Sequence, residues 1–257
     1  FVTRQGIRLF GEHEDGGSEA ICHNAVMEEL AAPGFLVIGT DSHTCTAGAF
    51  GQFSTGVGNT DAAFAMGTGK TWLKVPPTMK FTFHGAIPAY LTAKDLILAV
   101  IGRIGFSGAT YKAMYFTGSS ISSLTLEDRM TLTNMAIEAG GKNGICDVDE
   151  KTLEYVRARF NRPDWTVYTE DEGAEYEFEA EWDLESFEPL VAAPHSPDNT
   201  KTVSECKDVK LDRAYIGSCT GGNASPAPPS ASAGVGAQFF ASSRIVWNHG
   251  ADVPPTK

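Results

Sequence analysis

Pro33-Gly-Phe-Leu-Val-Ile-Gly-Thr-Asp-Ser-His-Thr44 is the stretch that decides the fold, because in it a short apolar run passes directly into a cluster of polar side chains. The apolar part, residues 35–39, predicts a buried β-strand, since it is short, contains β-branched residues and ends at a glycine. Ligands of open α/β sheets bind beyond the carboxyl ends of the strands. We therefore expect Asp41, Ser42 and His43 to lie at a ligand site; the alternative is a turn that caps a helix.

The order of these three residues also limits their chemistry. Consecutive residues are not expected to face one another as a serine hydrolase relay requires, so Asp41, Ser42 and His43 should find partners elsewhere in the fold. Asn134 and Glu138 are four residues apart on a predicted helix, which places both side chains on one face. A carboxylate at that position could orient or charge a histidine. The alternative is that the pair is an ordinary solvated surface feature.

A third polar cluster, Ser218-Cys-Thr220, directly follows a predicted strand at residues 213–217. A cysteine at a strand end can be a cluster ligand, a nucleophile or a small buried residue, and its spacing leaves all three interpretations open. Both polar clusters are expected at the carboxyl ends of neighbouring parallel strands. In that arrangement, the loop at residues 41–43 and Cys219 approach one another at one edge of the sheet.

From residue 35 onward, short apolar runs alternate with helical patterns, which is typical of an α/β fold. The run Thr92-Ala-Lys-Asp95 resembles a capping box and predicts the start of a helix. Residues 176–184 alternate apolar and acidic side chains, which predicts a half-buried strand whose charged face is solvated. We expect a three-layer α/β/α fold with a mainly parallel sheet. Further strands are predicted at residues 80–83 and 114–117, and further helices at residues 126–139 and 149–160.

Charge and composition argue against several classes of function. The chain has 32 Asp and Glu against 20 Lys and Arg, a net charge of −12, so a nucleic-acid partner would be repelled. Its five cysteines form no C-x-x-C pair, which favours a reducing compartment such as the cytoplasm or an organelle matrix. No apolar run approaches the roughly 20 residues of a membrane span. Nucleotide binding is discounted, because Phe64 stands where a phosphate-binding loop ending at residues 69–71 needs glycine.

Taken together, the polar clusters resemble the aconitase superfamily, whose motifs occur here in the same order and at similar spacing. The resemblance is carried by residues 33–44, Asn134-Met-Ala-Ile-Glu-Ala-Gly140 and Ser218-Cys-Thr220. Several independent motifs in register argue against coincidence. The chain resembles in particular the large subunit of 3-isopropylmalate dehydratases, at Gly56-Val-Gly58, Lys94-Asp-Leu-Ile-Leu98 and Gly108-Ala-Thr-Tyr-Lys112. It is similar to the homoaconitase-like form of that subunit at Pro194-His-Ser-Pro-Asp-Asn199.

This resemblance implies a hydro-lyase that reversibly dehydrates a hydroxy di- or tricarboxylic acid, such as 3-isopropylmalate in leucine biosynthesis. It also implies a [4Fe–4S] cluster that acts as Lewis acid, and a separate small subunit that carries the swivelling domain. In the family, carboxylate partners fix the tautomer of the active-site imidazoles and raise their pKa. The implied catalytic residues are His23 paired with Asp41 and His43 paired with Glu138. Ser42, Asn134 and Ser218 would lie beside substrate or cluster, and Cys219 would be the first cluster ligand.

Departures from the family pattern divide the chain into three expected parts. Residues 1–20 are an atypical N-terminal segment, residues 21–220 an incomplete aconitase-like core, and residues 221–257 a Pro/Ala/Ser-rich linker or disordered tail. The family's C-x-x-C pair after Cys219 is absent, and one matching cysteine cannot supply three thiolates. We therefore expect this truncated chain alone neither to retain the cluster nor to be active. The alternative is a non-catalytic remnant or interaction module that keeps the scaffold.

Overall fold

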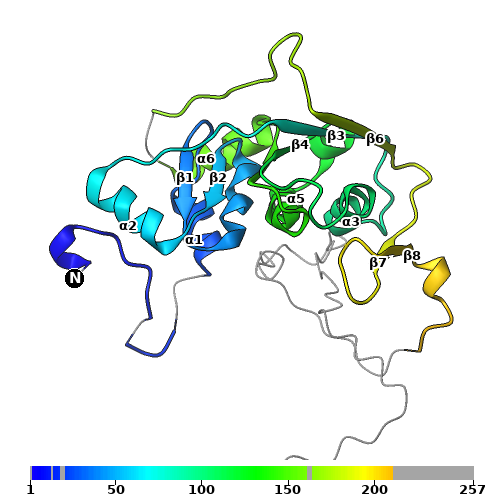
Figure 1. Cartoon of the computed structure of the whole chain (residues 1–257), viewed down its shortest axis with the longest axis horizontal. Coiled ribbons are helices and arrows are strands. Elements are labelled where there is room, and N and C mark those ends of the chain that lie inside the picture. Colours follow the sequence, from blue (N-terminus) through cyan, green and yellow to red (C-terminus); the bar gives the residue numbers. More distant parts are fainter. Residues whose placement is uncertain (1, 13, 18–20, 161–163, 211–257) are drawn as a thin grey trace, which may run out of the picture.

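The computed structural model describes residues 2–12, 14–17, 21–160 and 164–210, which Figure 1 shows in colour. Within these ranges, two short strands form a parallel pair, four form a parallel sheet in the order β5-β4-β3-β6, and two form an antiparallel pair. The predicted α/β class with mainly parallel sheets is confirmed. The strands are β1 (Leu36–Gly39), β2 (Phe53–Gly56), β3 (Thr78–His84), β4 (Ala113–Thr117), β5 (Asn143–Cys146), β6 (Phe178–Asp183), β7 (Leu190–Ala192) and β8 (Thr200–Thr202).

The helices alternate with these strands along the chain. The α-helices are α1 (Cys22–Glu29), α2 (Asn59–Thr68), α3 (Ala93–Ile104), α4 (Ser119–Ser123), α5 (Leu126–Asn134) and α6 (Glu150–Arg159). The 3₁₀ helices are η1 (Thr3–Gln5), η2 (Ser42–Phe50), η3 (Met135–Ala139) and η4 (Ser204–Cys206). Within the described ranges, no helix is long and apolar enough to cross a membrane. The strand expected at residues 213–217, Ser218, Cys219 and the tail at residues 221–257 lie outside the described residues.

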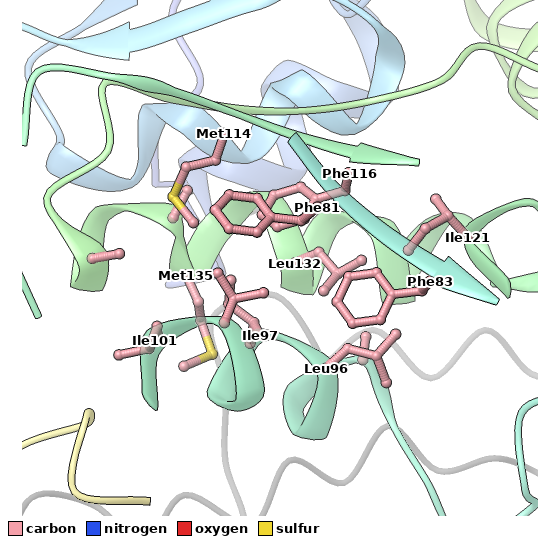
Figure 2. Close-up of a cluster of buried hydrophobic side chains, with 14 of the residues drawn as sticks. Phe81, Phe83, Leu96, Ile97, Ile101, Met114, Phe116, Ile121, Leu132 and Met135 are labelled. Atoms are coloured by element: carbon pink, nitrogen blue, oxygen red, sulfur yellow. The ribbon is translucent and has the colours of Figure 1, made fainter. Parts of the chain in front are cut away.

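The main core lies between the four-stranded sheet and helices α3 and α5 (Figure 2). Phe81 of β3 stacks on Phe116 of β4 with ring centroids 5.8 Å apart, and both rings are fully buried. The apolar face of α3 packs beneath these rings, and its first turn is closed by the expected capping box of Thr92 and Asp95. Local sequence and tertiary packing therefore agree in this half of the molecule.

The opposite face of the four-stranded sheet is polar. Lys80 of β3 pairs with Glu170 at 2.6 Å and lies 4.9 Å from the ring of Tyr176. The predicted alternation is confirmed for β6, where the exposed acidic residues alternate with Phe178, Ala180 and Trp182 on the core side. The expected apolar-face position of Tyr176 is wrong. This residue precedes the strand and stacks on Tyr115, which lies on the polar face.

A second core joins η2 to helices α5 and α6. Phe50 of η2 is fully buried there, beside Met130 of α5 and Val156 of α6. The single helix expected at residues 126–139 is corrected by the structure, because the α-helix ends at Asn134 and continues to Ala139 as the 3₁₀ helix η3. This second core fixes η2, and with it the polar loop after β1, against α5.

Candidate active site

The polar loop after β1 begins a helix. The Asp41 carboxylate accepts a hydrogen bond of 2.7 Å from the backbone N–H of His43 and so caps η2. The capping alternative is therefore correct for Asp41. Gly56 at the end of β2 packs directly on this turn, since a β-carbon there would lie 2.8 Å from the Asp41 carbonyl oxygen. The carboxyl ends of β1 and β2 thus hold the loop in place, as expected for a ligand site of an α/β sheet.

A chain of three side chains runs from Ser42 through His43 to Glu138. Ser42 Oγ lies 3.0 Å from His43 Nδ1, and His43 Nε2 lies 3.1 Å from Glu138 Oε1. The expected contact between His43 and Glu138 is present, although both side chains are about one-third exposed rather than buried. The expectation that neighbouring residues would not contact one another is wrong for Ser42 and His43. The carboxylate end of the chain comes from η3, 95 residues away in sequence.

His23 of α1 and Asp41 form a second histidine–carboxylate contact, with His23 Nε2 3.4 Å from Asp41 Oδ1. The side chain of His23 is 9% exposed, whereas that of Asp41 is 51% exposed. The rings of His23 and His43 lie 6.2 Å apart, so the two contacts belong to one cluster. The structure brings together all four residues that the sequence singled out as catalytic.

The two imidazoles have opposite electrostatic surroundings. Burial lowers the pKa of His23, and the nearby Asp41 charge offsets this only in part. The hydrogen bond to Glu138 raises the pKa of His43 despite its partial burial, and the charges of Glu138 and Asp41 act in the same direction. Neighbouring titratable groups whose pKa values are pushed apart are suited to separate acid and base roles.

Asn134 lies below this cluster and is 5% exposed. Its Nδ2 donates a hydrogen bond of 2.8 Å to Thr46 Oγ1, and its carbonyl oxygen accepts a weak one from the Cys45 thiol. The expectation of a surface pair with Glu138 is thereby excluded for Asn134. Through this hydrogen bond, Asn134 links the end of α5 to η2.

A cavity of about 450 Å³ opens beside the cluster at the carboxyl ends of β1 and β2. Asp41, Ser42, Tyr111 and Lys142 are among the residues that line it. The cavity has room for a small organic acid, with carboxylate, hydroxyl and ammonium groups on its wall.

Lys94 is a residue of this neighbourhood that sequence reasoning did not single out. It stands in the first turn of α3, where the helix dipole disfavours a cation. Burial lowers its pKa, and the charge of Glu138 is the largest influence that opposes this. A lysine directly inside a helix N-terminus was the available signal, because helix electrostatics alone favours an acidic residue there.

The described thiols do not suit an iron–sulfur cluster. Cys22, Cys45, Cys146 and Cys206 are free, and among the described residues no group of three His, Cys, Asp or Glu could hold a metal ion. Cys45 lies nearest the cluster of histidines, but burial raises the pKa of its thiol to about 12, which disfavours the thiolate. The described residues alone therefore do not supply a set of three ligands, and Cys219 lies outside them.

Comparison with known proteins gives consistent matches. A model of the aconitase family (aconitate hydratase) matches residues 2–209. The large subunit of chloroplastic 3-isopropylmalate dehydratase from Arabidopsis thaliana is 54% identical over 226 residues, which cover 85% of this chain and 44% of the plant protein. The 3-isopropylmalate dehydratase large subunit of Aquifex aeolicus is 52% identical over 222 residues, or 86% of this chain and 50% of the relative. The chain thus spans about half the length of the curated relatives it matches.

Proposed function

Because the chain belongs to the aconitase family, we propose that it is the catalytic core of a hydro-lyase large subunit. The reaction is the reversible removal of water from a hydroxy di- or tricarboxylic acid, and 3-isopropylmalate is the proposed substrate. Relatives at 51–54% identity carry the name of that dehydratase. The observation that carries the proposal is the Ser42–His43–Glu138 chain beside the His23–Asp41 contact.

The two histidines take different parts in this proposal. Loss of a hydroxyl group as water requires a proton donor, and His43 suits this role because its raised pKa favours the imidazolium. With Nε2–H donating to Glu138, Nδ1 faces the Ser42 hydroxyl and can give or take a proton there. Burial lowers the pKa of His23, which favours its neutral imidazole, the form that can accept a proton.

Other groups hold the substrate and the site in position. Asp41 caps η2 and orients His23 at the same time, which fixes the distance between the two imidazoles. Ser42 and Asp41 face the cavity, where Ser42 can donate a hydrogen bond to a substrate carboxylate. Lys142, which also lines the cavity, supplies a positive charge for a second carboxylate.

In the complete enzyme of this family, a [4Fe–4S] cluster would supply a Lewis acid for the hydroxyl group, with Cys219 as the proposed first ligand and Ser218 beside it. Because the described thiols do not form such a site, the cluster requires further cysteines from the complete enzyme. A small subunit with the swivelling domain is the proposed partner, since the relatives are named as large subunits. Free thiols among the described residues favour a reducing compartment, either the cytoplasm or an organelle matrix.

A hybrid large subunit would test the function. In it, residues 2–209 of this chain replace the corresponding half of the Arabidopsis relative, and the hybrid is assayed with a dehydratase small subunit and 3-isopropylmalate. His43→Asn and Glu138→Gln should each lower kcat by about a hundredfold, the usual size of a general acid–base contribution. The matched control is His84→Asn, because His84 also pairs with a glutamate, Glu181, at 3.7 Å but lies on an exposed strand end.

The control should keep full activity. Full activity of both His43→Asn and Glu138→Gln would remove these residues from the mechanism. An inactive hybrid that nevertheless folds and carries iron and sulfide would favour the alternative of a non-catalytic scaffold.

A further inference from the structure

Tyr111 has an unusual backbone conformation for its residue type. Its φ angle is 58°, and among the described residues it is the only one other than glycine with a positive φ. The left-handed conformation is costly for a bulky side chain, and such outliers cluster at ligand sites, where the surrounding structure imposes them. Tyr111 is also one of the residues that line the cavity beside the histidines. The groups around its ring indicate what this conformation serves.

Two lysines lie beside the Tyr111 ring. The Nζ atom of Lys142 is 5.3 Å from the ring centre and that of Lys74 is 6.0 Å away, both within the range of a cation–π contact. Hydrogen bonds tie the same segments together. The Tyr111 hydroxyl donates one of 3.4 Å to the Lys74 carbonyl oxygen, and the Lys142 N–H donates one of 2.8 Å to the Lys112 carbonyl oxygen. The two segments that carry the ammonium groups are thus both bonded to residues 111 and 112.

Lys74 and Lys142 form no ion pair within the ranges that the structure describes, whereas the neighbouring Lys112 pairs with Glu177 at 2.5 Å. This is notable in a chain with 32 Asp and Glu against 20 Lys and Arg. Ammonium groups that have no carboxylate partner can form charge-assisted hydrogen bonds with a bound anion. The two lysines therefore offer an anion a site at the cavity that Lys142 lines.

The acidic residues of the cavity limit how much negative charge the ligand can bring. Asp41 and Asp61 line the cavity as well, and both oppose an anion. The Asp41 charge is balanced by His43, whose imidazolium it favours by raising the pKa of the ring. Two ammonium groups against the remaining Asp61 carboxylate leave a net positive charge at the lysines, which suits one carboxylate group.

We propose that Tyr111 holds Lys74 and Lys142 together as a subsite for one carboxylate of a dicarboxylate ligand. Lys142 lies four residues after Glu138, so one short stretch of backbone places this subsite relative to the contact between His43 and Glu138. Tyr111 is a positioning residue in this arrangement, and the lysines bind the ligand. The inference rests on the proposed function and adds to it the residues that distinguish dicarboxylic from monocarboxylic hydroxy acids.

Isothermal titration calorimetry on the 257-residue chain tests the subsite without any turnover. The two probes are 3-isopropylmalate and 2-hydroxy-4-methylpentanoate, which is the same molecule without one carboxylate. The dicarboxylate should bind about tenfold more tightly, the usual size of one charge-assisted contact. Equal affinities of the two probes, or no binding of either, overturn the proposal.

Lysine variants show whether the preference comes from this subsite. Lys74→Met and Lys142→Met keep the length of the side chain and remove its charge, so each should remove most of the preference for the dicarboxylate. Lys112→Met is the matched control, because Lys112 adjoins Tyr111 but its ammonium is already paired with Glu177. A preference that survives in both lysine variants, or that is lost equally in the control, contradicts the assignment.

Inorganic phosphate separates a dicarboxylate subsite from a general anion site. Phosphate should displace 3-isopropylmalate from the chain only weakly, because the subsite suits a single carboxylate beside the Asp61 charge. Phosphate that competes with the affinity of 3-isopropylmalate would identify a general anion site and overturn the proposal.

Tyr111→Gly distinguishes a positioning role from a purely structural one. Glycine adopts a positive φ without strain, so the variant should lose most of the preference for the dicarboxylate while the Tm of the chain stays the same or rises. A lower Tm with an intact preference would mean that Tyr111 contributes to packing only, and it would overturn the positioning role.

The hybrid subunit described above separates this inference from the proposed function. Lys142→Met in the hybrid should raise the KM for 3-isopropylmalate about tenfold and leave kcat nearly unchanged, the pattern of a lost binding contact. An inactive hybrid, together with a chain that still prefers the dicarboxylate, would retain the subsite and reject the hydro-lyase function. An active hybrid whose KM is unchanged by Lys74→Met and Lys142→Met would do the reverse.

Discussion

A charged hydrogen-bond network lies at each end of the α5–η3 segment, and the two networks differ in how deeply their side chains are buried. At the α5 end, Arg129 is fully buried and donates hydrogen bonds to Asp149, Thr152 and the carbonyl oxygen of Ser122. At the η3 end, Glu138 bonds to His43 through Oε1, while both side chains remain about one-third exposed. The enclosed network joins helices α5 and α6, whereas the open one joins η2 to η3.

The unsatisfied atoms of the two networks sharpen this difference. Among the described residues, Arg129 Nε and Glu138 Oε2 are both buried without a hydrogen-bond partner. In the Arg129 network the other donors of the guanidinium are occupied, so the charge is shared over several acceptors. In the Glu138 network one carboxylate oxygen is buried beside an imidazole without a hydrogen-bond partner. Unsatisfied buried polar groups are uncommon in stabilising networks and are more frequent at functional sites.

The largest expected effect is on the enclosed network. Arg129→Ala should lower the free energy of unfolding by about 3–5 kcal/mol, because it removes a fully buried cation and leaves the buried Thr152 hydroxyl and the Asp149 carboxylate without this partner. Urea unfolding of the chain, followed by circular dichroism, measures the loss. Glu150→Ala is the control, since the ion pair of Glu150 with Arg157 lies at the surface. Equal losses for the two variants would mean that enclosure is not what makes the Arg129 network important.

Thr46→Val should have the next largest effect. The substitution leaves Asn134 Nδ2 without its acceptor in a site where both residues are buried, which costs about 1–3 kcal/mol. The contact between Asn134 and Thr46 is therefore expected to be more sensitive to substitution than the open network and less sensitive than the Arg129 network. The same unfolding assay checks this, with the exposed Thr68→Val as control. If Thr46→Val lost less unfolding free energy than Thr68→Val, the contact between Asn134 and Thr46 would contribute as little to stability as the network of Glu138 and His43.

Asp149→Asn tests the acid side of the enclosed network. Burial disfavours the Asp149 carboxylate, but the hydrogen bonds from Arg129 and Thr152 and the charge of Arg129 together outweigh it and lower the pKa of Asp149 to about 2. A depressed carboxyl pKa gives stability that is present above the unfolded value and is lost as pH falls through the folded value. Asp149→Asn should therefore cost about 1 kcal/mol at neutral pH after solvent screening. Wild type and variant should converge near pH 2, and parallel curves at all pH values would contradict this.

Glu138→Gln should have the smallest effect on stability, below about 1 kcal/mol, because its pair with His43 is partly exposed. The hydrogen bond to Glu138 raises the pKa of His43 above its ordinary value. Its stabilisation is complete below the unfolded histidine pKa and is lost as pH rises through the higher folded value, while Glu138 stays ionised. The variant should lower the His43 pKa in an NMR titration. Identical titration curves for the two proteins would show that the pair does not form in solution.

The sequence predicts the elements of the molecule better than their junctions. The capping box at Thr92 and Asp95, the strand around Phe81 and the alternation at Trp182 are visible because each depends on local spacing. Tyr176 breaks the alternation because it precedes the strand, and its position depends on contacts with Tyr115 and Lys80, which are distant in sequence. Local patterns fail where a residue is placed by a partner distant in sequence.

The candidate site shows the same limit. The resemblance to the family predicts the pairs His23–Asp41 and His43–Glu138. The spacing of these residues alone does not predict that α1, η2 and η3 meet. The contact between Ser42 and His43 was missed, since a 3₁₀ turn brings adjacent side chains closer than an extended strand end would. The neighbourhood of Lys94 and Glu138 depends on the packing of α3 against η3, which no local pattern encodes.

The change from α-helix to 3₁₀ helix at Asn134 alters the rotation and the rise per residue of the backbone. An α-helix turns about 100° and rises about 1.5 Å per residue, whereas a 3₁₀ helix turns about 120° and rises about 2.0 Å. Four residues later, at Glu138, the difference amounts to about 80° of rotation and about 2 Å of advance. The direction in which the Glu138 side chain points therefore depends on the helix type of η3. A rewinding of η3 into α-helix would turn Glu138 away from the His43 ring without changing a single side chain.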